Sequence, residues 1–154
     1  KGNMGGLAAA DALCQQQAAT YHFSGTYMAW LSNDTESPDT RFLLKSPGPY
    51  WTAGRLLIAN NWADLTSSEL EHAIGRALYP FDRCSPSEPA WSNTRADGTS
   101  RGAEGLHCQN WSSIGSTASD AGSTGQCGAT TSVWTEGGSM TCSLGGRLIC
   151  FQQS

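Results

Sequence analysis

Six cysteines in a chain of 154 residues constrain the fold more than any other feature. Two of them, Cys142 and Cys150, lie in the last stretch of the chain, and the other four lie upstream. No two form the close C-x-x-C pair that is common in zinc sites. Only 14% of the residues are charged and glycine is abundant, as in secreted, loop-rich domains. We therefore expect disulfides formed in an oxidising compartment, although six cysteines allow 15 pairings.

The length and charge of the chain narrow its class further. The sequence is long enough for one domain over residues 1–154, and no stretch approaches the roughly 20 consecutive apolar residues of a membrane helix. It begins at Lys1 without an apolar leader, so we interpret it as a processed or excised segment. The net charge is −4 and the arginines are spread singly. Because affinity for polyanions grows with clustered cations, nucleic acid is disfavoured as a partner.

Helical and extended patterns alternate in the first half of the chain. Residues 7–19 have strong helix propensity, and one face carries Leu7, Ala10, Cys14, Ala18 and Tyr21. Residues 27–31 read as a strand, and residues 50–58 can form a hairpin. Asn61 can cap a short helix that begins at Trp62. A capping-box pattern at 66–69 equally predicts helix through Ile74, and the residues alone leave both helix starts open.

The second half of the chain is mostly loop by composition. Residues 80–150 have no helical periodicity, and residues 112–129 are nearly all Gly, Ser, Thr and Ala, so we expect the most mobile surface there. Gly145 and Gly146 permit the positive φ of a tight reversal. A short β-prone segment at 147–152 then predicts a C-terminal strand.

Six sequence blocks, in chain order, match a known family. They are GGLAAADALC (5–14), GTYMAWLS (25–32), NNWADL (60–65), WSNTRADGT (91–99), CQNW (108–111) and GGRLIC (145–150). On these blocks the chain resembles the endostatin domain of collagens and, more closely, bacterial endostatin-like domains of unassigned function. The resemblance spans nearly the whole chain, so it is more specific than any single motif.

The resemblance implies a C-type-lectin-like α+β fold. Its parts would be a mixed, strongly twisted sheet, one main helix, one short helix near Trp62 and long disulfide-tied loops, with residues 69–78 extended. In the family a strand precedes the Gly-Gly helix and pairs near the C-terminal strand, and this sequence shows no counterpart. We expect that strand to have been cleaved away, to lie outside this segment, or to be supplied by another chain.

The resemblance also implies the disulfide pairing. Carried over residue by residue, it joins Cys14 to Cys150 and Cys108 to Cys142. The remaining two cysteines have no counterpart in the family and are expected to pair with each other, as Cys84–Cys127.

Metal binding has little support in the sequence. The histidines His22, His72 and His107 stand alone, without the H-x-x-x-H pair of a zinc site. Calcium is the alternative, because one loop supplies oxygens from Asn93, Asp97, Thr99 and Glu104. The same loop can instead be a simple Asp-Gly turn in which Asp97 bonds to its own backbone. We expect no cofactor, with calcium as the possible exception.

The tryptophans and the polar loop residues are the candidates for ligand contact. Trp30, Trp62 and Trp111 are expected in the core, whereas Trp51, Trp91 and Trp134 lie beside loops, where an exposed ring would suit stacking on a sugar. The ligand-binding candidates are therefore Trp91, Asn93, Arg95, Asp97, Arg101 and Trp134. The Asn110-Trp-Ser112 sequon lies inside a matched block, so we interpret Asn110 as structural.

No catalytic constellation is apparent, and no G-x-S-x-G elbow is present. We therefore expect an extracellular, secreted or surface-displayed, non-enzymatic binding or adhesion module that recognises glycans or glycoproteins through the loops after Pro80. One alternative is a structural subunit of an extracellular homo-oligomer or filament. Another is a hydrolase, if two carboxylates meet among Asp39, Asp64, Glu69, Glu71 and Glu104.

Overall fold

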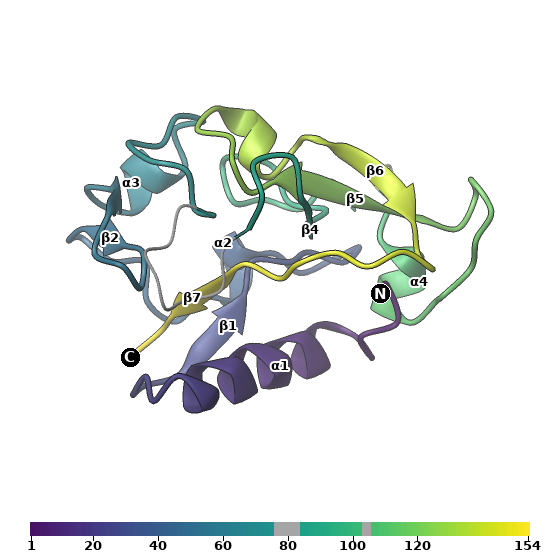
Figure 1. Cartoon of the computed structure of the whole chain (residues 1–154), viewed down its shortest axis with the longest axis horizontal. Coiled ribbons are helices and arrows are strands. Elements are labelled where there is room, and N and C mark those ends of the chain that lie inside the picture. Colours follow the sequence, from purple (N-terminus) through teal and green to yellow (C-terminus); the bar gives the residue numbers. More distant parts are fainter. Residues whose placement is uncertain (76–83, 103–105) are drawn as a thin grey trace.

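The computed structural model describes residues 1–75, 84–102 and 106–154. These residues form an α+β structure with one long helix, short helical turns and small antiparallel sheets. Figure 1 shows α1 (Leu7–Thr20) lying along β1 (Tyr27–Ala29) and β7 (Cys150–Gln152), with the three-stranded sheet on their other side. Within the described ranges, no helix combines the length and apolarity that crossing a bilayer requires.

The long helix confirms the sequence prediction and explains how β1 is held. Its buried residues Leu7, Ala10, Cys14 and Ala18 form one face, while Tyr21 follows the helix as its C-cap. β1 pairs antiparallel with β7, and Ala29 lies opposite Cys150. The other edge of β1 is covered by helix side chains, because Asp11 Oδ1 accepts from Ala29 N at 2.8 Å and Gln15 Oε1 accepts from Tyr27 N at 3.0 Å. These side chains replace a further strand at that edge.

Three disulfides connect distant parts of the chain. They are Cys14–Cys150 and Cys108–Cys142, which the resemblance implies, and Cys84–Cys127, the pair expected from the two remaining cysteines. The first spans 136 residues and ties α1 to β7. In the chain-entropy model, closing a loop of that length stabilises a domain by roughly 5 kcal/mol, and by less when other cross-links already restrain the chain.

The predicted hairpin and the short capped helix are both confirmed. β2 (Tyr50–Trp51) pairs with β3 (Leu57–Ala59), and α2 (Pro38–Arg41) precedes them. In α3 (Trp62–Leu65), Asn61 Oδ1 accepts from Asp64 N at 2.9 Å. Backbone and side-chain hydrogen bonds from Asn60 lower the pKa of the Asp64 carboxyl.

The capping-box alternative after α3 is wrong. Hydroxyls of Thr66 and Ser67 donate to carbonyls of the last turn, and Ser68 has a φ of 78°, so the chain leaves the helix. Glu69 instead forms an isolated bridge with Thr131. The extended segment expected over residues 69–78 lies partly outside the described residues.

Part of the region where we expected the most mobile surface is a strand of a three-stranded sheet. Its order is β4 (Pro89–Trp91), β5 (Ala121–Gln126) and β6 (Gly138–Thr141), so the Gly- and Ser-rich β5 is the central strand. A Cβ at Gly122 would lie 2.6 Å from the Trp91 ring, and one at Gly125 would collide with the Trp134 carbonyl. The prediction of mobility was wrong for residues 121–126, where the small residues make room for close packing.

Tryptophans occupy the centres of both hydrophobic clusters. Trp30 and Trp134 pack at 4.8 Å between ring centroids in one cluster, which also contains Phe42 and Phe151. Trp91 and Trp111 meet edge to face at 5.7 Å in the other, next to the buried face of α1. Trp134 belongs to the 3-10 turn η2 (Ser132–Trp134) that follows β5.

The C-terminal segment connects the β1–β7 pair to the three-stranded sheet. The backbone of Arg147 forms an isolated parallel β-bridge with Ala90 of β4, and the Arg147 Nε donates to Glu88 Oε1 at 2.7 Å. The backbone hydrogen bond from Ser85 and the contact with Arg147 lower the pKa of the Glu88 carboxyl. The positive φ expected at Gly145 and Gly146 is absent. Gly146 serves packing instead, since a Cβ there would lie 2.9 Å from Trp91 Nε1.

Candidate functional site

A left-handed turn is the most unusual backbone feature of the described chain. In α4 (Cys108–Trp111) all four residues have positive φ, with values of 50°, 53°, 54° and 63°. Left-handed helical backbone costs L-residues about 1–2 kcal/mol each. Such conformations persist only where the surroundings hold them, and they concentrate at functional sites. The turn therefore marks the loop surface around it as the candidate site.

Four anchors fix the ends of this turn. The Cys108–Cys142 disulfide holds its first residue. The Trp111 ring is fully buried, and its Nε1 donates to Ser32 O at 2.8 Å. Trp111 O accepts from Gly5 N at 2.9 Å and from Gly6 N at 3.2 Å, which connects the turn to the two residues before α1. His107 Nδ1 accepts from Asn110 N at 2.8 Å and caps the turn from its N-terminal side.

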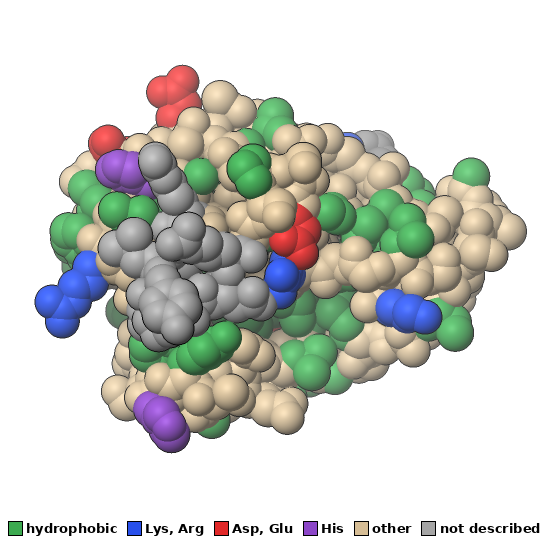
Figure 2. All heavy atoms as spheres, viewed as in Figure 1, with side chains coloured by type: hydrophobic (Ala, Val, Ile, Leu, Met, Phe, Trp, Pro, Cys, Tyr) green, Lys and Arg blue, Asp and Glu red, His purple; other side chains and the backbone are tan. Residues whose placement is uncertain are grey.

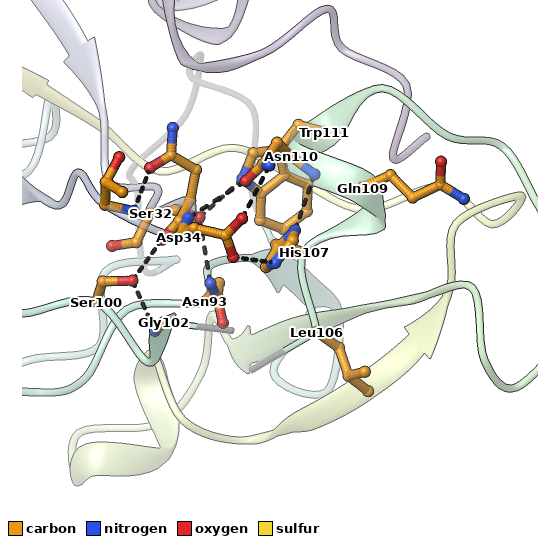
Figure 3. Close-up of polar contacts among 12 residues, drawn as sticks. Ser32, Asp34, Asn93, Ser100, Gly102, Leu106, His107, Gln109, Asn110 and Trp111 are labelled. Atoms are coloured by element: carbon orange, nitrogen blue, oxygen red, sulfur yellow. Dashed lines mark hydrogen bonds and ion pairs between the residues drawn. The ribbon is translucent and has the colours of Figure 1, made fainter. Parts of the chain in front are cut away.

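Asp34 clamps the turn from a second loop, as Figure 3 shows. Its Oδ1 lies 2.7 Å from His107 Nε2, and its Oδ2 accepts from Asn110 Nδ2 at 3.1 Å. Its backbone N donates to Asn110 Oδ1 at 3.2 Å. Because His107 Nδ1 accepts a backbone N–H, the neutral ring carries its proton on Nε2 and donates it to Asp34. Both ends of the Asn110 amide are engaged, which confirms its structural role.

The outer side of the clamp is a polar surface open to solvent. Asp34, Gln109 and Asn110 are exposed, whereas the neighbouring Ser32 and Trp111 are buried. The exposed polar side chains are therefore attached to a backbone that buried contacts hold in place. The sequence did not predict this site. His107 and Asn110 were noted separately, and nothing in the sequence indicated that both contact Asp34.

A buried network of hydroxyls supports the loops beneath this surface. Thr135 Oγ1 accepts from Trp30 Nε1 at 2.9 Å and donates to Thr94 O at 2.9 Å. It also lies 2.6 Å from Ser92 Oγ, and the Thr94 hydroxyl lies 2.7 Å from that of Ser32. Satisfied buried networks of this kind make loops rigid and specify one conformation.

Three of the predicted ligand-binding residues are buried, so those predictions were wrong. Trp91 and Trp134 are 1% and 0% exposed, since each ring fills one of the two cores. Asn93 is 0% exposed, and its Nδ2 points toward Ser32 O at 3.5 Å. None of the three can offer a ring or an amide at the surface.

The loop proposed for calcium is the simple Asp-Gly turn. Asp97 Oδ1 accepts from Thr99 N at 2.9 Å and from Thr99 Oγ1 at 2.6 Å, and Gly98 has a φ of 85°. Partial burial opposes ionisation, but the hydrogen bonds from Thr99 hold the pKa of the Asp97 carboxyl below its usual value. Arg95 is exposed, and its Nη1 donates to Ser100 O at 2.7 Å. Glu104 lies outside the described residues.

Clustered acids are also lacking elsewhere in the part of the chain that the structure describes. There, no group of three or more His, Cys, Asp or Glu residues is placed to hold a metal ion. Two of the carboxylates considered for hydrolysis have separate partners, since Asp39 pairs with Lys45 at 2.7 Å and Asp64 accepts from Asn60.

A pocket of about 370 Å³ lies beside the turn, and one of its lining residues is Leu106, the neighbour of His107. Its lining includes two charged side chains, two serine hydroxyls, one apolar side chain and two glycines. These residues are Arg101, Leu106, Ser123, Glu136, Gly137, Gly138 and Ser139. Arg101 is the predicted ligand-binding residue found there. The volume falls in the range of small-molecule sites.

Comparison with models of known protein families gives no match, and comparison with curated protein sequences gives none either. On the face drawn in Figure 2, Lys and Arg side chains lie apart from one another. The chemistry of the loop surface is therefore the basis for assigning a function.

The strain in the left-handed turn predicts that substitution by glycine has different effects on stability at two adjacent residues. Gln109→Val should lower the free energy of unfolding by about 1 kcal/mol, because a β-branched side chain is disfavoured at positive φ. Gln109→Gly should cost nothing, since relief of strain offsets the entropy of glycine. Asn110→Gly should cost about 1–2 kcal/mol, because it relieves strain but removes the hydrogen bonds to Asp34. Urea denaturation measures all three, and a Gln109→Gly variant as unstable as Gln109→Val would contradict the assignment.

Proposed function

We propose that this protein is an extracellular, non-enzymatic binding module that recognises a glycan or a glycoprotein through the loops after Pro80. It would be secreted or displayed at a cell surface, and its fold would be C-type-lectin-like, of the endostatin-like kind. The observation that carries the proposal is the rigid polar surface formed by Asp34, His107, Gln109 and Asn110.

Rigidity at an exposed polar surface favours binding for a physical reason. Binding orders side chains and loops at the interface, and the entropy that they lose weakens the affinity. Groups that are already ordered in the free protein avoid this loss and bind more tightly. Here the cost of a left-handed backbone is met in the free protein by the Cys108–Cys142 disulfide, by Trp111 and by Asp34. A loop that served only as a connection would not need this arrangement.

The cross-links support the proposed compartment. Disulfides form and persist mainly in oxidising environments, and all six cysteines of this chain are paired. The fold is in keeping with the proposal in its coarse form, because long loops between short α and β elements are tied by those bonds. Fold alone is weak support for a ligand, so the loop surface has to be tested directly.

The test is binding of the whole chain to a glycan array and to a panel of extracellular-matrix proteins, in calcium and again in EDTA. We expect binding that Gln109→Arg weakens at least about ten-fold, because a long cation then covers the turn. Gln17→Arg, on the exposed side of α1, is the matched control and should bind as the unmodified protein does.

The outcomes separate the alternatives. Loss of binding in EDTA would support calcium at the loop of residues 93–104, and binding that survives EDTA would support direct recognition by side chains. Absence of binding to every glycan and protein in both conditions would contradict the proposal.

Self-association is the second candidate function, and an apolar groove favours it. Among the described residues, β7 pairs with β1 alone. Next to β7 lies a groove of about 1000 Å³, whose walls include the exposed side chains of Leu13, Leu44 and Trp51. Exposed apolar surface beside a strand edge is the usual setting for strand addition by another chain.

Light scattering over a range of protein concentrations tests this second function. Assembly through the groove predicts a mass that rises with concentration and falls back to that of the monomer in Trp51→Lys, because a charge then enters the apolar contact. Arg55→Ala, in the turn between β2 and β3, is the control and should assemble normally. A monomer at every concentration would exclude the groove as a self-association surface.

A further inference from the structure

We propose that the pocket between Arg101 and Glu136 binds one neutral sugar residue at the end of a glycan. This inference rests on the proposed function, because it names the ligand class for the same loop surface. It concerns a site beside the left-handed turn rather than the turn itself, and its lining residues come from four separate segments of the chain.

Two neighbouring strands give the pocket its hydroxyl groups. Ser123 of β5 and Ser139 of β6 are cross-strand partners, so their side chains project from the same face of the sheet. Ser123 Oγ accepts from Leu106 N at 3.1 Å, which holds the edge of the pocket against the sheet. Ser139 is exposed. Gly138, the exposed first residue of β6, has open space where a side chain would lie, so a ligand can approach main-chain groups there.

One cation and one anion complete the lining. Among the described residues, no hydrogen bond or ion pair engages the Arg101 guanidinium, whereas its backbone N donates to Asn93 O at 3.1 Å and fixes the chain there. Glu136 is also fixed, because its Oε1 accepts from Ala96 N. The pocket therefore presents up to five N–H donors beside an anchored carboxylate acceptor.

This combination selects a neutral polyol over a charged ligand. A sugar hydroxyl both donates and accepts, so adjacent hydroxyls can donate to Glu136 and accept from Arg101 at the same time. Both charges line the same pocket, so a uronic acid paired with Arg101 also meets the negative charge of Glu136, and an amine paired with Glu136 also meets the positive charge of Arg101. The second contact is repulsive in each case and offsets the ion pair. The exposed side chain of Leu106 adds an apolar patch for the C–H groups of a ring.

The experiment is a titration of the whole ¹⁵N-labelled chain followed by NMR. The probes are methyl α-mannoside, methyl β-galactoside and methyl β-N-acetylglucosaminide, with glucuronate as the acidic comparison. We expect a neutral glycoside to shift the amide signals of Leu106, Gly137 and Ser139. Arg101→Gln and Glu136→Gln should each raise its Kd about ten-fold or more, because each removes a charge-assisted hydrogen bond.

Matched controls separate this effect from general charge or folding effects. Arg55→Gln and Glu71→Gln change the same charges at exposed positions outside the pocket and should leave the Kd unchanged. Glu136→Gln keeps an oxygen for Ala96 N, so an unchanged spectrum elsewhere will show that the fold is intact. Ser139→Tyr, which fills the pocket with a side chain, should abolish the shifts.

Each contrary outcome has a distinct meaning. Tighter binding of glucuronate, strengthened further by Glu136→Gln, would overturn the neutral class. Array or protein binding that Gln109→Arg weakens, without any glycoside shift at the pocket, would overturn this inference and leave the proposed function standing. No binding in either assay would overturn both.

Discussion

The packing of the Trp91 ring against glycine is the constraint on which the loop surface depends. A Cβ at Gly122 would lie 2.6 Å from that ring and 2.8 Å from Cys108 Sγ, and a Cβ at Gly146 would lie 2.9 Å from Trp91 Nε1. Because neither glycine carries a side chain, β4, β5 and the C-terminal segment can pack closely around the Trp91 indole. The Cys108–Cys142 disulfide is packed into the same place, so the left-handed turn begins from a fixed point.

The surface above this core is held by polar contacts that reach between loops. Asp34 engages His107 and Asn110, while Trp111 reaches down to Ser32, so the second loop is bound to the turn on both its exposed and its buried side. Close-packed interiors transmit such constraints without slack. The binding proposals rest on these contacts, because packing in the core fixes the positions of the donors and acceptors at the surface.

The sequence predicted best those features that depend on neighbours along the chain. The face of α1 and the Asn61 cap follow from local spacing. The family resemblance implied two of the three disulfide pairs, and the third, Cys84–Cys127, joins the two cysteines that remained. The central strand β5 escaped prediction because its small residues are explained only by the tryptophans packed against them. The clamp by Asp34 escaped for the same reason, since its partners lie more than 70 residues away.

Amide hydrogen exchange tests most directly whether the loop surface is preformed. The account predicts slow exchange in the oxidised, unliganded protein at Asn110, Trp111 and Ser123, whose N–H groups donate within the protein. Selective reduction of Cys108–Cys142 should speed exchange at Asn110 and Trp111 first, because the turn then loses its fixed end. Fast exchange at these amides in the oxidised protein would show that the turn is not held, and it would contradict the central claim.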